Sequence, residues 1–169
     1  KEPDYRYRYP SNRGEDLLEH CSKNQKKISD LVLENEFERY GESYTKKRFS
    51  EIWPGMLEAM YEGCHTTGEL PGGLKVARRA AKMNRELIEN YNYSTPEGWI
   101  KAIRNSRVRF RQILQWVSCF AIAVNEVNAA MGRVVTAPTN GSAGVIPAVL
   151  MYYLVIENHQ GGEAEIERF

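Results

Sequence analysis

The chain has 169 residues, of which 23 are basic and 22 acidic, so its formal net charge is +1. This balance gives no overall field that would select nucleic acid or an anionic membrane, and a hydrophobic content of 42% is ordinary for a soluble globular protein. The length predicts one domain, or most of one, over residues 1–169.

The first ten residues are charged and aromatic, which does not fit a signal peptide. Within them, residues 5–10 alternate tyrosine with arginine or proline, a pattern that suits an extended edge or a docking arm. Helical periodicity begins at Glu15. A second helix is expected over residues 29–40, with Ser29 as its N-cap and Gly41 as its stop.

Apolar and aromatic side chains then recur every three or four residues from Phe49 to Tyr61, which predicts a helix with a wide apolar face. Pro54 should kink this helix or mark its start, and Gly63 should end it. We interpret the methionines and aromatic rings on that face as core packing rather than a cofactor site.

Residues 65–73 read as a loop, and a helix with one strongly basic face is expected over residues 74–91. Cations in the first turns of a helix oppose its dipole unless an anion offsets them. Lys75 and Arg78 therefore become candidates for contact with an acidic partner or an anionic ligand.

A helix start is indicated by Thr95 as cap and Pro96 at the first position. Regular apolar spacing behind it predicts one long central helix that ends near Met131, with its second half buried.

That second half contains Asn125, Glu126 and Asn128. Buried polar groups need hydrogen-bond partners or a polar cavity. Two interpretations stay open: these side chains fasten the following loop through its backbone, or they line a polar pocket.

The segment Gly132–Ala148 combines glycines, prolines, hydroxyls and an amide between two apolar segments. A buried helix is expected over residues 145–156, and Pro147 fits only its first turn, so the helix should begin close to residues 142–144. Free backbone amides at a helix start favour a carboxylate or phosphate. The polar groups available there are those of Thr136, Thr139, Asn140 and Ser142, with Gly141 keeping the approach open.

The three cysteines, Cys21, Cys64 and Cys119, are too few and too widely spaced for a disulfide framework, and they form no metal-binding motif. We expect free thiols in a reducing cytoplasm and no metal at the Cys64–His65 pair. The longest apolar runs, near residues 113–124 and 145–156, are too short to span a bilayer, so no membrane segment is expected.

No lysine follows the glycines and no strand precedes them, so the loop is neither a P-loop nor a dinucleotide-binding fingerprint. The three histidines show no Ser-His-Asp pattern. From the residues alone, the chain is a helical domain with a carboxylate-binding loop.

Three blocks, residues 132–149, 123–129 and 70–79, resemble the alpha chain or alpha domain of bacterial iron–sulfur-dependent L-serine dehydratases, and residues 10–18 resemble it more loosely. The resemblance implies an all-α multi-helix fold and conversion of L-serine to pyruvate and ammonia, with the open iron of a [4Fe-4S] cluster acting as Lewis acid on the substrate hydroxyl. It assigns substrate contact to Thr139, Asn140, Gly141 and Ser142, and less directly to Thr136 and Lys75. The catalytic base stays unassigned.

The cluster cysteines of that family lie downstream of the Thr-Ala-Pro-Thr-Asn-Gly block, in a region that this chain lacks. Cys64 and Cys119 lie upstream and are interpreted as buried thiols. We therefore expect no cluster on this chain and no activity from it alone.

The implied partners are L-serine, the beta domain and the remainder of the alpha domain. Apolar surface left exposed around residues 145–156 predicts self-association into a homo-oligomer. No nucleic-acid partner is expected, because acidic residues balance the basic ones. Two alternatives remain: a non-catalytic helical scaffold, and a related lyase of the cysteine desulfidase type.

Overall fold

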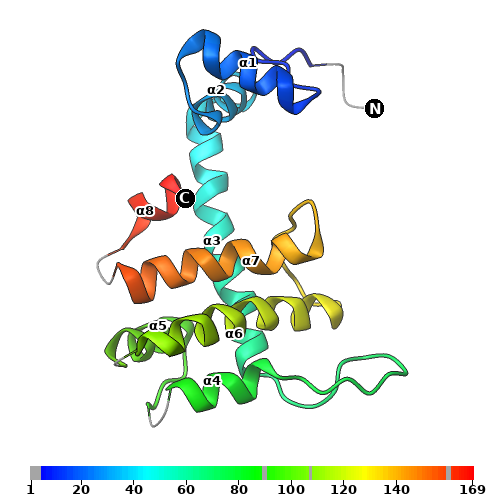
Figure 1. Cartoon of the computed structure of the whole chain (residues 1–169), viewed down its shortest axis with the longest axis vertical. Coiled ribbons are helices and arrows are strands. Elements are labelled where there is room, and N and C mark those ends of the chain that lie inside the picture. Colours follow the sequence, from blue (N-terminus) through cyan, green and yellow to red (C-terminus); the bar gives the residue numbers. More distant parts are fainter. Residues whose placement is uncertain (1–4, 89–90, 107, 159–160) are drawn as a thin grey trace. The chain divides into compact units, whose positions relative to one another are not determined.

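The computed structural model describes residues 5–88, 91–106, 108–158 and 161–169, and the regular structure in these ranges is helical. The single β pairing among them is an isolated antiparallel bridge between Glu69 and Ala77. The predicted all-α fold is therefore confirmed. In chain order the elements are α1 (Gly14–Asn24), α2 (Ile28–Tyr40), α3 (Glu42–His65), α4 (Ala80–Ile88), α5 (Pro96–Asn105), α6 (Phe110–Ala129), α7 (Asn140–Tyr152), the π-helix η1 (Tyr153–Glu157) and α8 (Glu163–Arg168) (Figure 1).

The chain divides into two compact units, Lys1–Phe49 and Ser50–Phe169, and the boundary falls inside α3. In the first unit α1 packs against α2. Both helices occur where the periodicity predicts them, and Gly41 caps α2 with a positive φ of 85°. Ser29 is not the N-cap, because α2 begins one residue before it. The carboxylate of Asp30 instead accepts the backbone N–H of Lys27 at 3.0 Å.

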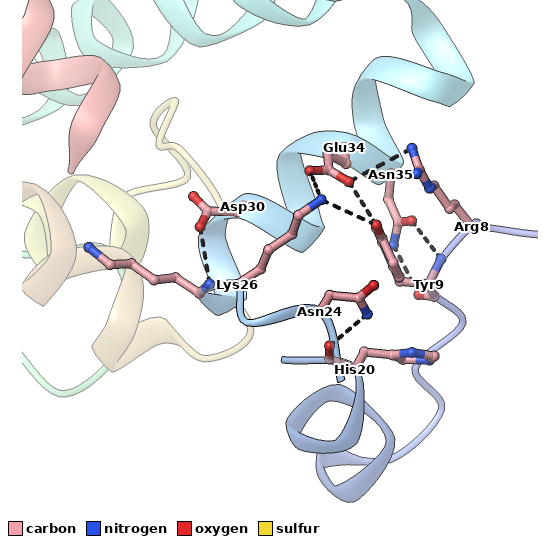
Figure 2. A network of polar contacts seen from close by, with 9 residues as sticks. Arg8, Tyr9, His20, Asn24, Lys26, Asp30, Glu34 and Asn35 are labelled. Atoms are coloured by element: carbon pink, nitrogen blue, oxygen red, sulfur yellow. Dashed lines mark hydrogen bonds and ion pairs between the residues drawn. The ribbon is translucent and has the colours of Figure 1, made fainter. Parts of the chain in front are cut away.

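The segment before α1 docks on α2, as one of the two interpretations of its tyrosines predicts. Tyr9 is 6% exposed, and its backbone N–H and C=O are both bonded by the side-chain amide of Asn35, at 2.9 and 3.0 Å. Its hydroxyl donates to Glu34 at 2.8 Å, and Lys26 bonds the other oxygen of that carboxylate at 2.5 Å. Figure 2 shows Tyr9 enclosed by these side chains and by Arg8.

In the second unit, α6 lies between α4 and α7, and α7 runs antiparallel to it (Figure 1). The α6–α7 contact is the most extensive between any two elements. Trp99 on α5 and Trp116 and Phe120 on α6 are fully buried in the shared core.

The end of α3 differs from the prediction. Gly63 does not stop the helix, which continues to His65. A Cβ atom at Gly63 would overlap the backbone of Ala123 on α6. Glycine is therefore used here for close packing of two helices. Pro54 lies inside α3.

The predicted central helix is two helices, because α5 ends at Asn105 and α6 begins at Phe110. Ser106 adopts an extended conformation (ψ 138°), and its hydroxyl donates to the carbonyl of Ile103 at 2.6 Å. The next helix begins with the side chain of Gln112 accepting the backbone N–H of Arg109 at 2.8 Å. Thr95 and Pro96 start α5 as predicted.

Helix α7 begins at Asn140, earlier than predicted, so Pro147 lies in the helix interior rather than in its first turn. Proline there lacks the N–H that would bond the carbonyl of Ala143. Its ring is fully buried, and this packing offsets the missing hydrogen bond. Residues 163–168 form the short helix α8.

Together α7 and η1 form a continuous 18-residue helical stretch that is long and apolar enough to cross a bilayer by length and composition. This stretch exceeds the predicted apolar run over residues 145–156, and 44% of it is buried within the structure. Core helices of soluble proteins pass the same test, so it is weak evidence for a membrane span.

Candidate functional site

Four of the six predicted site residues form the start of α7. Thr139 is the N-cap, with extended backbone (φ −135°, ψ 155°), and its hydroxyl oxygen accepts the amide of Ser142 at 3.2 Å. The hydroxyl groups of Thr139 and Ser142 are 2.9 Å apart. The amides of Asn140 and Gly141 precede the first intrahelical hydrogen bond, and both residues are exposed. A helix therefore does start at these residues, slightly earlier than predicted, and binding of an anion to it stays a prediction.

The other two predicted site residues are not part of this helix start. Thr136 is exposed in the non-helical segment that precedes α7. Lys75 lies in a separate loop, is exposed and has a positive φ of 50°.

The helix predicted over residues 74–91 begins only at Ala80. Ahead of it, the chain doubles back on itself, with Leu70 N–H bonded to Val76 C=O and Arg78 N–H bonded to Gly68 C=O, both at 2.8 Å. The dipole argument for Lys75 and Arg78 is therefore wrong, because neither residue is helical. The Pro-Gly-Gly sequence at 71–73 is the turn signal that favours this hairpin.

Glu126 connects this hairpin to α6. Its Oε1 accepts the backbone N–H of Arg79 at 2.6 Å, at the residue just before α4. The side chain is buried, with the residue only 4% exposed, and Oε2 has no hydrogen-bond partner among the described residues. A hollow of 140 Å³ lies at this point. Its lining residues come from the hairpin and from α6: Leu70, Val76, Ala77, Arg79, Ile122, Asn125 and Glu126.

Asn125 lies between this hollow and the start of α7. A Cβ atom at Gly144, in the first turns of α7, would be 3.0 Å from both polar atoms of the Asn125 side chain. The same Cβ would be 2.9 Å from the carbonyl of Ala121, so glycine allows α7 to approach α6 here. The three sequence blocks, residues 70–79, 123–129 and 132–149, therefore meet around Asn125 and Glu126.

Neither interpretation of the Asn/Glu/Asn group is met as stated, because the hollow beside Glu126 has a mainly apolar lining and the backbone that Glu126 bonds belongs to another loop. Glu126 bonds backbone, although that of Arg79 rather than that of the segment after α6, and it lines a hollow with Asn125. Only Glu126 is buried. Asn125 is exposed and Asn128 is partly buried, so burial of the whole group was overestimated. The reason is that no described residue covers one side of α6, where Leu114, Ser118 and Asn125 are exposed.

A larger hollow, of 690 Å³, lies at the break between α5 and α6 and includes Tyr91, Arg109 and Trp116. It involves none of the three blocks. The hollow beside Glu126 is therefore the better candidate for a functional role.

Cys64 and Cys119 are buried free thiols, as predicted, with their Sγ atoms 3.7 Å apart. Burial raises the pKa of the Cys64 thiol well above its usual value, and Cys119 and Glu126 raise it further. A thiol that keeps its proton is a poor metal ligand. Among the described residues, no group of three His, Cys, Asp or Glu side chains is placed to hold a metal ion.

A polar network that sequence reasoning missed joins the end of α3 to α4 and α5. His65 Nδ1 faces the carbonyl of Tyr61 at 2.5 Å, so that nitrogen donates and Nε2 accepts from the hydroxyl of Tyr93 at 2.9 Å. Buried Asn84 donates to the same hydroxyl and accepts from the indole N–H of Trp99. Both ring nitrogens of His65 are therefore used in hydrogen bonds that hold the fold.

Comparison with known proteins identifies the chain's relatives. The family model described as serine dehydratase alpha chain matches residues 23–169. An L-serine dehydratase of Haemophilus influenzae is 46% identical over 145 residues, which are 86% of this chain and 29% of that protein. One from Streptomyces coelicolor is 43% identical over 87% of this chain, and L-serine dehydratase 2 of Escherichia coli is 38% identical over 86%. The chain spans about 29% of the length of each.

Proposed function

Because this chain belongs to the serine dehydratase alpha chain family, we propose that it is part of an L-serine ammonia-lyase and supplies a clamp for the substrate carboxylate. The reaction is the conversion of L-serine to pyruvate and ammonia. We place it in the cytoplasm, in keeping with the free thiols.

The family resemblance calls for a [4Fe-4S] cluster, and the described residues do not fit one. Cys64 and Cys119 are buried free thiols, burial raises the pKa of the Cys64 thiol, and among the described residues no third ligand lies beside them. We assign the cluster to the part of the family polypeptide that lies outside this chain, and we propose that the chain alone is inactive. What its own residues contribute is binding and orientation.

The observation that carries the proposal is the open start of α7. The exposed amides of Asn140 and Gly141 point along a helix dipole whose positive end favours an anion. The Thr139–Ser142 hydrogen bonds fix the backbone of this turn before any ligand arrives. A carboxylate bound here would replace the water that otherwise satisfies the two amides. Thr136 and Lys75 remain weaker candidates for substrate contact.

Glu126 and Asn125 connect α6 to the hairpin and to the helix that carries the clamp. Glu126 holds the hairpin of residues 68–79 against α6, and Asn125 contacts α7 at Gly144. The hairpin and the clamp therefore share one supporting helix. We propose that this arrangement keeps both at a fixed position relative to the substrate.

The test uses the full-length Haemophilus influenzae relative in which the matched segment is replaced by this chain, hereafter the chimaera. It is reconstituted anaerobically with iron and sulfide, and pyruvate formed from L-serine is measured. Turnover is expected with L-serine, and sulfide release from L-cysteine is measured in parallel to test the desulfidase alternative. A chimaera with a full cluster and no turnover on L-serine would refute the proposal.

Asn140→Ala tests within that chimaera whether the Asn140 side chain contributes to the clamp, because alanine keeps the backbone N–H and removes only the side-chain amide. The variant should lose at least about tenfold in kcat/KM if that amide helps to align the substrate carboxylate. The matched control is Asn105→Ala, at an exposed position at the end of α5. Equal kinetics for the two variants would remove the Asn140 side chain from the site.

A further inference from the structure

The outward side of α7 is apolar and uncovered in the described structure. Val145, Ile146, Val149 and Tyr153 are 52, 40, 37 and 37% exposed. Their spacing places them along one side of the helix, and the buried residues Gly144, Pro147, Ala148 and Met151 form the other side. We call these four exposed residues, of which Tyr153 is the first residue of η1, the outer face of α7.

Charge is missing from the whole of this region. No Asp, Glu, Lys, Arg or His occurs from Val134 to Ile156. A helix on the surface of a soluble protein carries polar residues opposite its buried side, whereas a helix that is apolar all round is buried in the finished fold. The outer face therefore has the composition of an interface rather than of a free surface.

The length of the relatives indicates what covers it. The chain matches about 29% of each, so about seven tenths of their polypeptide lies outside the match. We propose that an apolar segment from that remainder packs along Val145, Val149 and Tyr153. A second copy of this chain would cover the same residues but would bring a second clamp and none of the missing sequence.

The experiment measures accessibility rather than activity, so its failure is separate from failure of the proposed function. Val149→Cys is made with Cys21→Ser, both in the 169-residue chain and in the chimaera. The rate of maleimide labelling is read by mass spectrometry of the peptide that carries position 149. Lys82→Cys, on the exposed side of α4, is the matched control, and the native buried thiols Cys64 and Cys119 report folding because they react only after unfolding.

We expect the thiol introduced at position 149 to react as fast as the one at position 82 in the isolated chain at low concentration. In the chimaera, the thiol at position 149 should react at least about tenfold more slowly than the control. Equal labelling at both positions in the chimaera would overturn the proposal. Protection that appears in the isolated chain and grows with concentration, with none added in the chimaera, would assign the face to a second copy and would also overturn it.

A second measurement covers the case in which the isolated chain does not fold. Val149→Lys in the chimaera places a charge under the covering segment and should lower its melting temperature by several degrees. Lys82→Glu should not. Equal melting temperatures for these two variants would refute packing at Val149 without reference to the isolated chain.

Discussion

The two units of this chain hold their helices together by different means. In the described part of the first unit, Tyr9 and Leu31 are the buried hydrophobic side chains. The helices of this unit are also held together by hydrogen bonds and cation–π contacts. Arg39 lies 4.7 to 5.5 Å from the ring centres of Tyr5, Tyr7 and Tyr40. The second unit instead has a continuous apolar core around Trp99, Trp116 and Phe120.

The difference predicts different sensitivities. Interactions between partly exposed charges depend on pH and salt, whereas core packing depends on the volume and shape of each side chain. The first unit should therefore respond to solution conditions and the second to single substitutions. The candidate site belongs entirely to the second unit, so its geometry should be stable across the conditions that disturb the first.

The largest effect is expected at the crossing of α3 and α6. Gly63→Ala places a methyl group into the backbone of Ala123 and should destabilise the second unit by about 3 kcal/mol, as measured by urea unfolding. Gly55→Ala, in the same helix, meets only Val135 at 3.4 Å and should be neutral or stabilising by about 0.5 kcal/mol. If both variants have the same stability, α3 does not approach α6 as closely as described.

Glu126→Ala should have the next largest effect, about 1–3 kcal/mol, because it leaves the backbone N–H of Arg79 without its acceptor. Glu126→Gln keeps an acceptor at that place and should cost less. Hydrogen exchange at Arg79 and at the first amides of α4 should increase in the alanine variant only. Equal exchange in the two variants would show that the carboxylate does not cap α4.

The caps of α5 and α7 provide a matched pair with a smaller effect. Thr95 and Thr139 each accept an amide three residues ahead, at 3.1 and 3.2 Å. Alanine at either position should cost about 1 kcal/mol of stability. In the chimaera, only Thr139→Ala should also lower kcat/KM for L-serine. A loss of activity of the same size for Thr95→Ala would mean that stability, not the clamp, explains the effect.

The parts of the fold that sequence predicted are those with local causes. The helix start at Thr95 and Pro96 and the helix stop at Gly41 follow from neighbouring residues. The break between α5 and α6 was missed because the apolar residues Ile103 and Phe110 are seven residues apart, which equally fits one continuous helix. The N-cap of α6 is Arg109, and the side chain of Gln112 accepts its backbone N–H. Arginine is not one of the residues preferred at an N-cap, so the sequence did not indicate a helix start here.

The candidate site also has one part that the sequence predicts and one part that it does not. The polar helix start at Thr139–Ser142 could be predicted, since glycine, threonine and serine favour it locally. The contact between Glu126 and Arg79 joins residues that are 47 apart in sequence, so no local sequence pattern predicts it. The same contact explains why helix propensity failed at Lys75, because the bond to Arg79 and the hairpin keep residues 74–79 out of the helix.

The smallest effect is expected in the first unit, and it depends on pH. The hydrogen bond from Lys26, followed by that from Tyr9, holds the pKa of Glu34 below its usual value of 4.5. Since the folded pKa lies below the unfolded one, Glu34 stabilises the docked arm above pH 4.5, and this contribution is lost as the pH falls through the lowered pKa. Glu34→Gln should remove this acid dependence, read from hydrogen exchange at the amide of Tyr9 between about pH 6 and 3.

Glu19→Gln is the control for that measurement, because Glu19 pairs with Lys23 on α1. Exchange at Tyr9 should keep its acid dependence in this variant. At high salt the wild-type chain should behave more like Glu34→Gln, since the pair is partly exposed and screening weakens it. The packing of the second unit should not respond over the same range. If the core around Phe120 loosened together with the arm, the two units would not be stabilised by different means.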